Sequence, residues 1–492
     1  MKESKSSYKE IVKATSIFGG VQLLNIVIQL LRSKGVAVLL GPTGIGLMGL
    51  FNSTLSLVAS ATNFGLASSA VRSISESNNS QNNFEIKETI SVVRKLIWIT
   101  GTLGFVVTII LSPLLSNLTF GNYDYTLPFV ALSITLLVNQ ITVGQLVLMQ
   151  GLREITLLAK AGIYSSVLGL VISLPLYYLF GIDSIVPAII LSSFAALIVQ
   201  YYFARKLNFT TTSISLKLAF QKGRPMLKLG FILSLSSFIT IGTSYIVRIY
   251  ISNIGGIAEV GFYNAGFAII NTYVGMVFSA MLTDYYPRLA EVNKDQNKCN
   301  ELINQQIEIA VYILSPLICI FLIFINWIVI ALYSSKFLPI TDMIHWGIMA
   351  IYFQSLSWAI GLLLLVKGNS RHYFWNEFIA NLYLLGLNVL GYYYFGLKGL
   401  GISFLIGYIL HFLQIYFFAR KYYGFKLERN NIQTFIINLS VGILCFVLSV
   451  RLGDQLVYLI GTPIIVAITI FSFYKVNKRI GLLEIVKSKF KK

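Results

Sequence analysis

YYLFGIDSIVPAIILSSFAALIVQYYFARK, residues 177–206, is the stretch that decides the fold, because its pattern returns later in the chain. Residues 392–421 read YYYFGLKGLGISFLIGYILHFLQIYFFARK and are identical at nine of thirty positions, at an offset of 215. In both copies one apolar stretch ends in Tyr-Tyr-x-Phe-Gly and the next ends in Phe-Ala-Arg-Lys. The repetition predicts two homologous halves.

Two glycine patterns support the same duplication. The offset of 215 carries Gly41 and Gly46 of GPTGIG onto Gly256 and Gly261 of GIAEVG, and at a shift of 217 the segment GQLVLMQG (144–151) aligns with GLLLLVKG (361–368). The alternative is recurrence by composition alone, since aromatic and basic residues are common at membrane ends. Matches in the same order favour duplication.

The composition excludes a soluble globular protein. Of 492 residues 56% are hydrophobic and 12% charged, whereas soluble domains carry about 25% charged residues. The 38 Lys+Arg against 19 Asp+Glu give a net charge of +19, which indicates either a nucleic-acid partner or loops that face the cytoplasm. Three cysteines without a CxxC pair favour no disulfide framework and no metal site, and we expect no cofactor.

Apolar stretches of about 20 residues predict membrane-spanning helices. The first stretch is too long for a signal peptide and is kept as a span. The fourteen predicted spans are Ile11–Leu40, Ile45–Leu66, Leu96–Leu115, Leu127–Met149, Leu157–Phe180, Ile185–Phe203, Leu227–Ile254, Val260–Leu282, Ile309–Tyr333, Ile344–Val366, Tyr373–Phe395, Leu400–Phe418, Ile432–Val450 and Leu456–Phe473.

The cations indicate the topology. With the N-terminus inside, the predicted cytoplasmic segments hold 4, 4, 2, 6, 3, 2, 4 and 7 Lys or Arg, which is 32 of 38. This bias obeys the positive-inside rule with both termini cytoplasmic, so the charge argues for no nucleic-acid partner. The exported loops are too short for a separate catalytic domain. The six remaining cations are Arg32, Lys34, Arg248, Lys336, Lys398 and Arg451.

The predicted fold is an all-α polytopic membrane protein. Six spans separate the two copies, so the halves have the same orientation, and such parallel repeats place a cavity between two lobes. We expect two six-helix bundles plus two C-terminal helices. The predicted divisions are an N-terminal lobe at 1–206, a cytoplasmic linker at 207–226, a C-terminal lobe at 227–421, and two extra helices with a basic tail at 422–492.

Short motifs distinguish between superfamilies with this plan. The loop NFGLASSAVRSISE (63–76) lacks the G-x-x-x-D-R motif that major facilitator proteins have there. The chain resembles oligosaccharide flippases of the multidrug/oligosaccharidyl-lipid/polysaccharide (MOP) superfamily, above all the Wzx-type O-antigen translocases. The resemblance extends to about residue 421 and is carried by LLGPTGIGLMGLF (39–51), FGLASSAVR (64–72), VGFYNAGFAIINTY (260–273) and TDYYPRLA (283–290).

The resemblance implies a MATE-like fold and a flippase. It implies alternating-access export of undecaprenyl-pyrophosphate-linked oligosaccharide, for O-antigen, lipopolysaccharide or a related surface polysaccharide, to the outer leaflet of the bacterial cytoplasmic (inner) membrane. Its implied partners are the lipid-linked sugar, the bilayer and other polysaccharide assembly proteins. The coupling ion, H⁺ or Na⁺, stays open. By the same analogy the last two helices form a groove for the lipid tail.

Two arginines are predicted at membrane depth. Arg32 precedes the end of its span by eight residues and Arg248 by six, or about 12 and 9 Å at 1.5 Å per residue. A planar guanidinium suits a pyrophosphate, and the resemblance implies that role for Arg32. Lys34 is a weaker candidate because it lies about 200° round the helix from Arg32. The alternative is that these cations snorkel to the interface or pair with an acid such as Glu259.

Other polar residues within spans have two readings: they line a path for sugars, or they form interhelical hydrogen bonds. Glu377 in the eleventh span either carries a coupling proton or cation, or pairs with Arg371. Asp284 and Arg288 are expected to be a solvated i,i+4 pair. The polar candidates besides Glu377 are Asn52, Asn139, Gln140, Gln145, Asn271, Gln354 and Asn381.

Two other functions are weighed against the flippase. A cation-coupled multidrug exporter of the same fold needs an acid in its amino-terminal cavity, yet no Asp or Glu occurs between Glu10 and Glu76. A membrane polysaccharide polymerase or ligase usually carries a large exported loop, and none is predicted. The sequence therefore favours a transporter over an enzyme.

Overall fold

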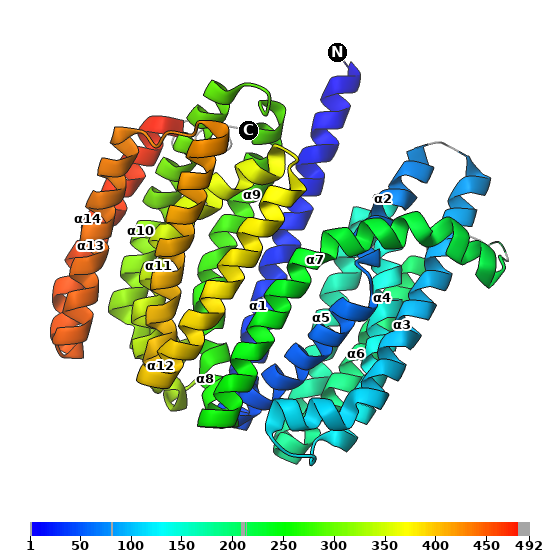
Figure 1. Cartoon of the computed structure of the whole chain (residues 1–492). Coiled ribbons are helices and arrows are strands. Elements are labelled where there is room, and N and C mark those ends of the chain that lie inside the picture. Colours follow the sequence, from blue (N-terminus) through cyan, green and yellow to red (C-terminus); the bar gives the residue numbers. More distant parts are fainter. Residues whose placement is uncertain (1, 80–81, 208–211, 213, 481–492) are drawn as a thin grey trace. The chain divides into compact units, whose positions relative to one another are not determined.

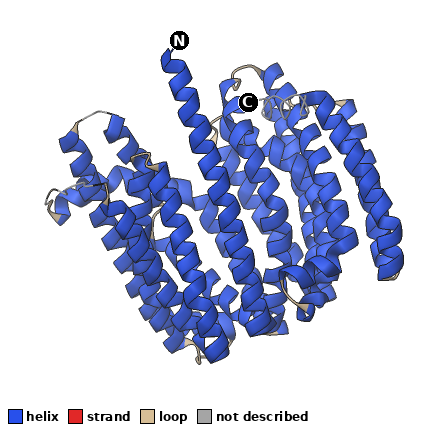
Figure 2. Ribbon diagram, turned by 180° about the vertical axis from the view of Figure 1, so that it is seen from behind, coloured by secondary structure: helices blue, strands red, loops and turns tan. Residues whose placement is uncertain are grey.

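The computed structural model describes residues 2–79, 82–207, 212 and 214–480, and within them the chain is helical with no strand (Figures 1 and 2). Short η1 (Gly181–Ser184), η2 (Ala268–Val274) and η3 (Ser335–Ile340) join longer helices. The α-helices are α1 (Lys2–Thr62), α2 (Leu66–Asn79), α3 (Asn83–Phe120), α4 (Thr126–Gly151), α5 (Ile155–Phe180), α6 (Ile185–Arg205), α7 (Leu216–Gly255), α8 (Ile257–Phe267), α9 (Gly275–Glu291), α10 (Gln296–Leu332), α11 (Thr341–Val366), α12 (Ser370–Tyr423), α13 (Arg429–Arg451) and α14 (Asp454–Ile480).

The helices agree with the predicted all-α membrane fold. Within the described part of the chain, ten helical stretches are long and apolar enough to cross a membrane, or eleven with the bent helix α7. Three of these stretches contain a glycine turn that separates two helical segments, at Gly41, Gly181 and Gly396. Eleven stretches with three such turns are consistent with the fourteen predicted spans.

The repeat is visible in the backbone. Gly181 and Gly396, 215 residues apart, have nearly the same conformation, with φ 57° and ψ −137° in the first and φ 57° and ψ −140° in the second. Gly41 and Gly256 also share a positive φ, of 65° and 86°. A positive φ favours glycine, because glycine has no Cβ. The repeated glycines therefore lie where the chain makes equivalent turns.

The other two repeated glycines contact each other's turns reciprocally. A Cβ added to Gly46 would lie 2.0 Å from the carbonyl oxygen of Ile257, and one added to Gly261 would lie 1.9 Å from that of Pro42. Each contacted carbonyl belongs to the residue after a turn glycine, so the two contacts are equivalent under the 215-residue offset. Small residues allow this close approach of backbones in membrane helix packing.

The chain divides into two compact units, residues 1–261 and 262–492. The first unit includes α7, which packs on α1, α2 and α3. The Tyr245 hydroxyl on α7 is 2.7 Å from the Thr119 hydroxyl on α3. Helix α7 begins at Leu216, inside the stretch predicted as a linker. The boundaries at 206, 226 and 421 stay predictions.

In the second unit, α13 and α14 pack against α10 and against each other, as Figure 1 shows. Asn304 of α10 ties the start of α13 in place: its amide nitrogen donates to the Lys426 carbonyl at 2.9 Å, and its carbonyl groups accept from Asn431. Further along α13, Gly442 lies against the ring of Tyr352, which a Cβ would approach to 2.6 Å. The two helices outside the repeat are therefore part of the core of this unit.

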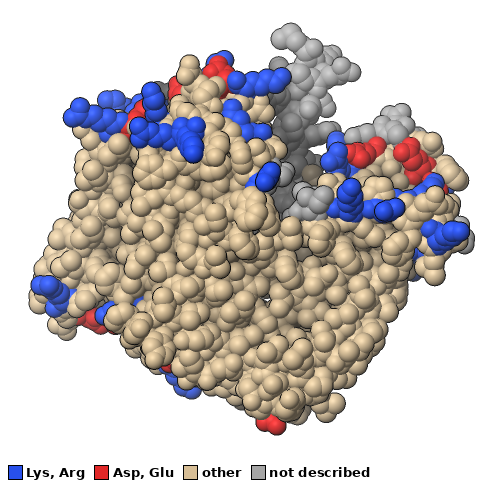
Figure 3. All heavy atoms as spheres, viewed as in Figure 1, with Lys and Arg blue, Asp and Glu red and all other residues tan. Residues whose placement is uncertain are grey.

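On the face that Figure 3 shows, the charged side chains avoid a broad apolar band. Figure 3 shows Lys and Arg gathered mostly toward one end of each unit, with a wide band free of charge beyond them. Large apolar side chains are exposed in both units, among them Ile110 and Leu459. In water such exposure would be unfavourable, whereas in a bilayer it is expected. The surface therefore fits a protein that crosses the membrane several times.

Candidate functional site

Arg32 lies beside a buried tyrosine. It is half-buried on α1, and its guanidinium lies close enough to the hydroxyl of Tyr177 on α5 to act on it electrostatically. Tyr177 is only 1% exposed, and its hydroxyl has no hydrogen-bond partner among the described residues. The first helical part of α1 ends at Gly41, which keeps Arg32 about 12 Å from that end. Tyr177 opens the repeated Tyr-Tyr-x-Phe-Gly phrase, and its equivalent Tyr392 is also buried. The repeat phrase thus supplies a neighbour for the predicted phosphate-binding residue.

Arg248 is half-buried on α7 and belongs to the same unit as Arg32. Its Nη1 donates to the carbonyl oxygen of Ser244 at 3.0 Å and also to the Ser244 hydroxyl. Because Ser244 lies one turn earlier on α7, these bonds hold the guanidinium along its own helix. Both predicted arginines therefore lie on helices of the first unit that pack against each other, α1 and α7.

The remaining candidates of the first unit differ in burial. Lys34 is half-buried on α1, Asn52 is exposed on the second span of α1, and Gln145 is buried in α4. Asn139 is exposed, whereas Gln140 donates to the Thr100 hydroxyl at 2.9 Å. Gln140 thus forms an interhelical hydrogen bond, which was the alternative to a role in a sugar path.

In the second unit, Glu377 lies among tyrosines. Its carboxyl group is half-buried on α12 and acts electrostatically on the hydroxyls of Tyr373, Tyr383 and Tyr408. Within the described residues it forms no ion pair with Arg371, whose side chain is exposed. Of the two readings of Glu377, the pairing with Arg371 therefore has no support in the structure.

Gln354 and Asn381 belong to the same polar region. Gln354 of α11 donates from Nε2 to the Tyr408 hydroxyl at 3.0 Å, and Asn381 donates from Nδ2 to the backbone carbonyl of Glu377 at 2.9 Å. Asn271 lies apart from these residues in sequence, in η2, and is exposed. The structure thus brings three of the predicted candidates of this unit together, on α11 and α12.

Several buried polar atoms of α11 and α12 lack a hydrogen-bond partner in the described structure: Gln354 Oε1, Tyr383 Oη and His411 Nε2. Buried polar atoms are normally satisfied by protein or water, so these atoms favour a hydrated or ligand-binding interior. Tyr383, Tyr408 and His411 were not predicted. The one available signal was that Tyr408 and His411 lie three residues apart on one helix, which places them on one face.

The solvated pair is confirmed. Arg288 Nη1 is 3.1 Å from Asp284 Oδ2, and both side chains are exposed. It lies on α9 and needs no functional role.

A model of a family of polysaccharide biosynthesis proteins matches residues 36–342, more than half of the chain. The chain belongs to this family. No curated protein matches it.

Solved structures similar to this polysaccharide biosynthesis protein are MOP superfamily transporters. An inward-facing multidrug resistance MATE transporter of that superfamily has a TM-score of 0.70 at 14% identity, over 81% of this chain and 94% of its own. The lipid II flippase MurJ, in an inward closed conformation, has a TM-score of 0.66 at 13% identity, over 95% of this chain and 99% of its own. A MOP superfamily transporter from Pyrococcus furiosus has a TM-score of 0.60 at 15% identity, over 84% and 96%.

At these identities the similarity establishes the fold. The polysaccharide biosynthesis protein has the MOP fold and is a multi-pass membrane protein, as predicted from its spans and repeat. The MurJ structure covers 95% of this chain, so the similarity extends past residue 421 into the segment that holds α13 and α14. The MATE structure covers 81% of the chain.

Proposed function

We propose that this protein is a flippase that moves a polyprenyl-pyrophosphate-linked oligosaccharide across the bacterial cytoplasmic membrane by alternating access. The repeat unit belongs to O-antigen or a related surface polysaccharide, and both termini face the cytoplasm. The observation that carries the proposal is Arg32, a guanidinium at membrane depth beside Tyr177 in a polysaccharide biosynthesis protein. A cation at such depth is costly unless it has a function or a partner.

The chemistry of the substrate explains the residue types. A pyrophosphate needs cationic donors with fork geometry, which Arg32 and Arg248 supply, with Lys34 as a weaker contributor. A sugar chain needs a path of polar groups, for which Gln354, Asn381 and the exposed Asn52 and Asn271 are candidates. Transport against a gradient needs a coupling ion, and Glu377 is the candidate for it, with H⁺ or Na⁺ as the ion.

The lipid-linked substrate is favoured over the alternatives by charge. A cation-coupled drug exporter requires acids in the first bundle, whereas the first two spans carry none and contain three cations instead, Lys13, Arg32 and Lys34. A polymerase or ligase requires reactive groups in an exported domain, which the chain does not provide between its predicted spans. The proposed role is therefore transport rather than catalysis. The proposed protein partners are the other assembly proteins that make and use the polysaccharide.

The test is substitution of the two arginines in a strain that lacks its own flippase gene. Removal of one charge-assisted hydrogen-bonding group costs about 1.5–3 kcal/mol, so Arg32→Ala and Arg248→Ala should each lower surface polysaccharide by roughly tenfold or more. Lipid-linked repeat units should accumulate on the inner leaflet. Arg32→Lys keeps the charge without the fork and should restore part of the transport.

The matched control is Arg451→Ala, an exposed arginine at the end of α13. It should leave surface polysaccharide unchanged, and immunoblots of membranes should show equal amounts of every variant. Normal polysaccharide from both Arg32→Ala and Arg248→Ala would disprove the proposed pyrophosphate site.

A further inference from the structure

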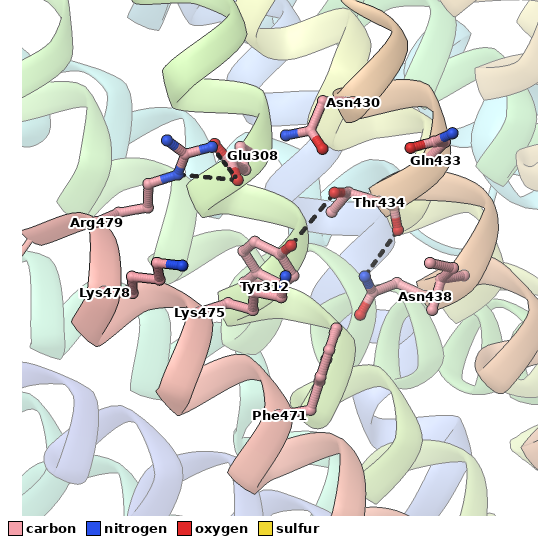
Figure 4. Close-up of a pocket in the computed structure, with 11 residues that line it drawn as sticks. Glu308, Tyr312, Asn430, Gln433, Thr434, Asn438, Phe471, Lys475, Lys478 and Arg479 are labelled. Atoms are coloured by element: carbon pink, nitrogen blue, oxygen red, sulfur yellow. Dashed lines mark hydrogen bonds and ion pairs between the residues drawn. The ribbon is translucent and has the colours of Figure 1, made fainter.

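A separate polar pocket lies within the second unit, between α10, α13 and α14 (Figure 4). Its volume is about 370 Å³, within the range of about 300–1,000 Å³ that small-molecule sites occupy. The positive-inside pattern assigns this end of the helices to the cytoplasm. None of the predicted transport residues lines the pocket.

One wall of the pocket is cationic. Lys475, Lys478 and Arg479 reach into it from the last turns of α14 (Figure 4). Arg479 is neutralised by Glu308 of α10, with Nη2 at 3.1 Å from Oε1. Neither lysine forms an ion pair with a carboxylate among the residues that the structure describes. Among the described residues that line it, the pocket therefore carries two positive charges without a compensating carboxylate, which favour an anionic ligand.

The opposite wall holds a buried acceptor. Asn438 of α13 is 0% exposed, and its Nδ2 donates to the Thr434 carbonyl at 2.8 Å, which leaves Oδ1 without a partner in the described structure. The Thr434 hydroxyl lies 3.2 Å from that of Tyr312 on α10 and holds this wall in place. An unsatisfied buried carbonyl is unfavourable, so a ligand with a hydroxyl donor suits this end of the pocket.

The rim of the pocket is apolar on the side of the membrane. Ile437 lines the pocket and is 51% exposed on the outer surface of α13. The ring of Phe471 lies 5.5 Å from the Lys475 ammonium and closes the bottom of the cationic wall. A free anion has no use for an apolar rim, whereas a lipid places its acyl chains there. The position and the polarity therefore favour a ligand that arrives from the bilayer.

We propose that this pocket binds the headgroup of an anionic phospholipid with free hydroxyls, which is the chemistry of phosphatidylglycerol. The phosphate lies between Lys475 and Lys478, a headgroup hydroxyl donates to Asn438 Oδ1, and an acyl chain leaves over Ile437. Bound there, the lipid bridges α13 and α14 to α10. This site is independent of the transported substrate.

The experiment measures lipid binding to the purified full-length protein in neutral detergent, by native mass spectrometry and thermal unfolding. Four probes are compared at equal concentration: phosphatidylglycerol, phosphatidylmethanol of the same charge without hydroxyls, phosphatidylcholine, and water-soluble glycerol 3-phosphate. The wild type should bind phosphatidylglycerol about tenfold more tightly than either other lipid. Equal stabilisation by glycerol 3-phosphate would overturn the proposal of a lipid and indicate a site for soluble phosphates.

Two variants test the two walls. Lys475→Gln/Lys478→Gln should lose the preference for phosphatidylglycerol over phosphatidylcholine, whereas the control Arg420→Gln/Lys421→Gln, two exposed cations at the end of α12, should keep it. Asn438→Leu leaves the charges of Lys475 and Lys478 in place but removes the acceptor for the headgroup hydroxyl. It should therefore bind phosphatidylglycerol and phosphatidylmethanol equally.

An unchanged preference in the lysine variant would overturn the site. Because binding is measured without transport, failure of the proposed flippase activity leaves this result unaffected.

Discussion

Substitution of Gly261 with alanine perturbs the reciprocal contact between the two repeats. The new Cβ would lie 1.9 Å from the carbonyl oxygen of Pro42. The obstructing atom belongs to the backbone, so no side-chain rotation relieves the clash. Because real Cβ atoms keep at least 3.0 Å from such neighbours, the two segments have to separate by roughly 1 Å. Overpacking of this kind costs about 1–3 kcal/mol.

The reciprocal geometry predicts that a second substitution adds little. In Gly46→Ala the Cβ would lie 2.0 Å from the carbonyl oxygen of Ile257, and this clash requires the same separation of the same two segments. One displacement relieves both contacts. The double variant should therefore cost clearly less than the sum of the two single variants, a coupling of about 1 kcal/mol or more.

The assay is thermal unfolding of the purified protein in detergent, with the four members of the double-mutant cycle measured side by side. Gly162→Ala on α5 is the control, because no heavy atom other than those of its chain neighbours and its own helix backbone lies within 4 Å of its added Cβ. It should be neutral or stabilising by up to about 1 kcal/mol, since alanine favours helix over glycine. A Gly261→Ala protein as stable as the wild type, or strictly additive costs, would refute the reasoning.

Further predictions concern topology and the polar region of the second unit. The three native cysteines are buried, so an impermeant thiol reagent applied to intact cells should label a cysteine at Asp124 and spare one at Lys294 until the cells are opened. The reverse pattern would invert the topology. Tyr408→Phe removes the acceptor for Gln354 and should lower stability by about 0.6 kcal/mol, at most about 1.7, measured by thermal unfolding; no loss would mean that the bond contributes nothing. Glu377→Gln should abolish the dependence of transport on its coupling ion at normal protein levels, whereas unchanged ion dependence would assign the carboxyl group a structural role.

The elements of the fold were largely predictable, because a bilayer imposes length and polarity on each span. The offset of 215 predicted equivalent turns at Gly181 and Gly396, and the structure gives them nearly the same φ and ψ. The left-handed residue after the fourth span is Arg153, 215 residues before Gly368. The left-handed residues Arg153 and Gly368 therefore match at the common offset of 215, whereas the glycines Gly151 and Gly368 match at a shift of 217.

For the candidate site, the sequence could predict single residues by their type but could not predict which residues lie beside them. Arg32 and Glu377 stand out because charge is rare inside a membrane. Tyr177 comes from α5 and Tyr408 from the far side of the Gly396 turn in α12, and nothing in the local sequence indicates which helical segments meet. The same holds for the pocket, whose walls come from Glu308, Asn438 and Lys475 on three helices.

The sequence by itself determined the membrane-spanning helices, their predicted orientation and the duplication, since these follow from hydropathy, charge bias and periodicity along one chain. Only the tertiary structure decided the packing: that α7 belongs with the first unit, that α13 and α14 close onto α10, and that an asparagine carbonyl faces two lysines. The physical reason is that inside a bilayer helices associate through close packing and a few polar contacts. Those depend on the three-dimensional register of distant residues.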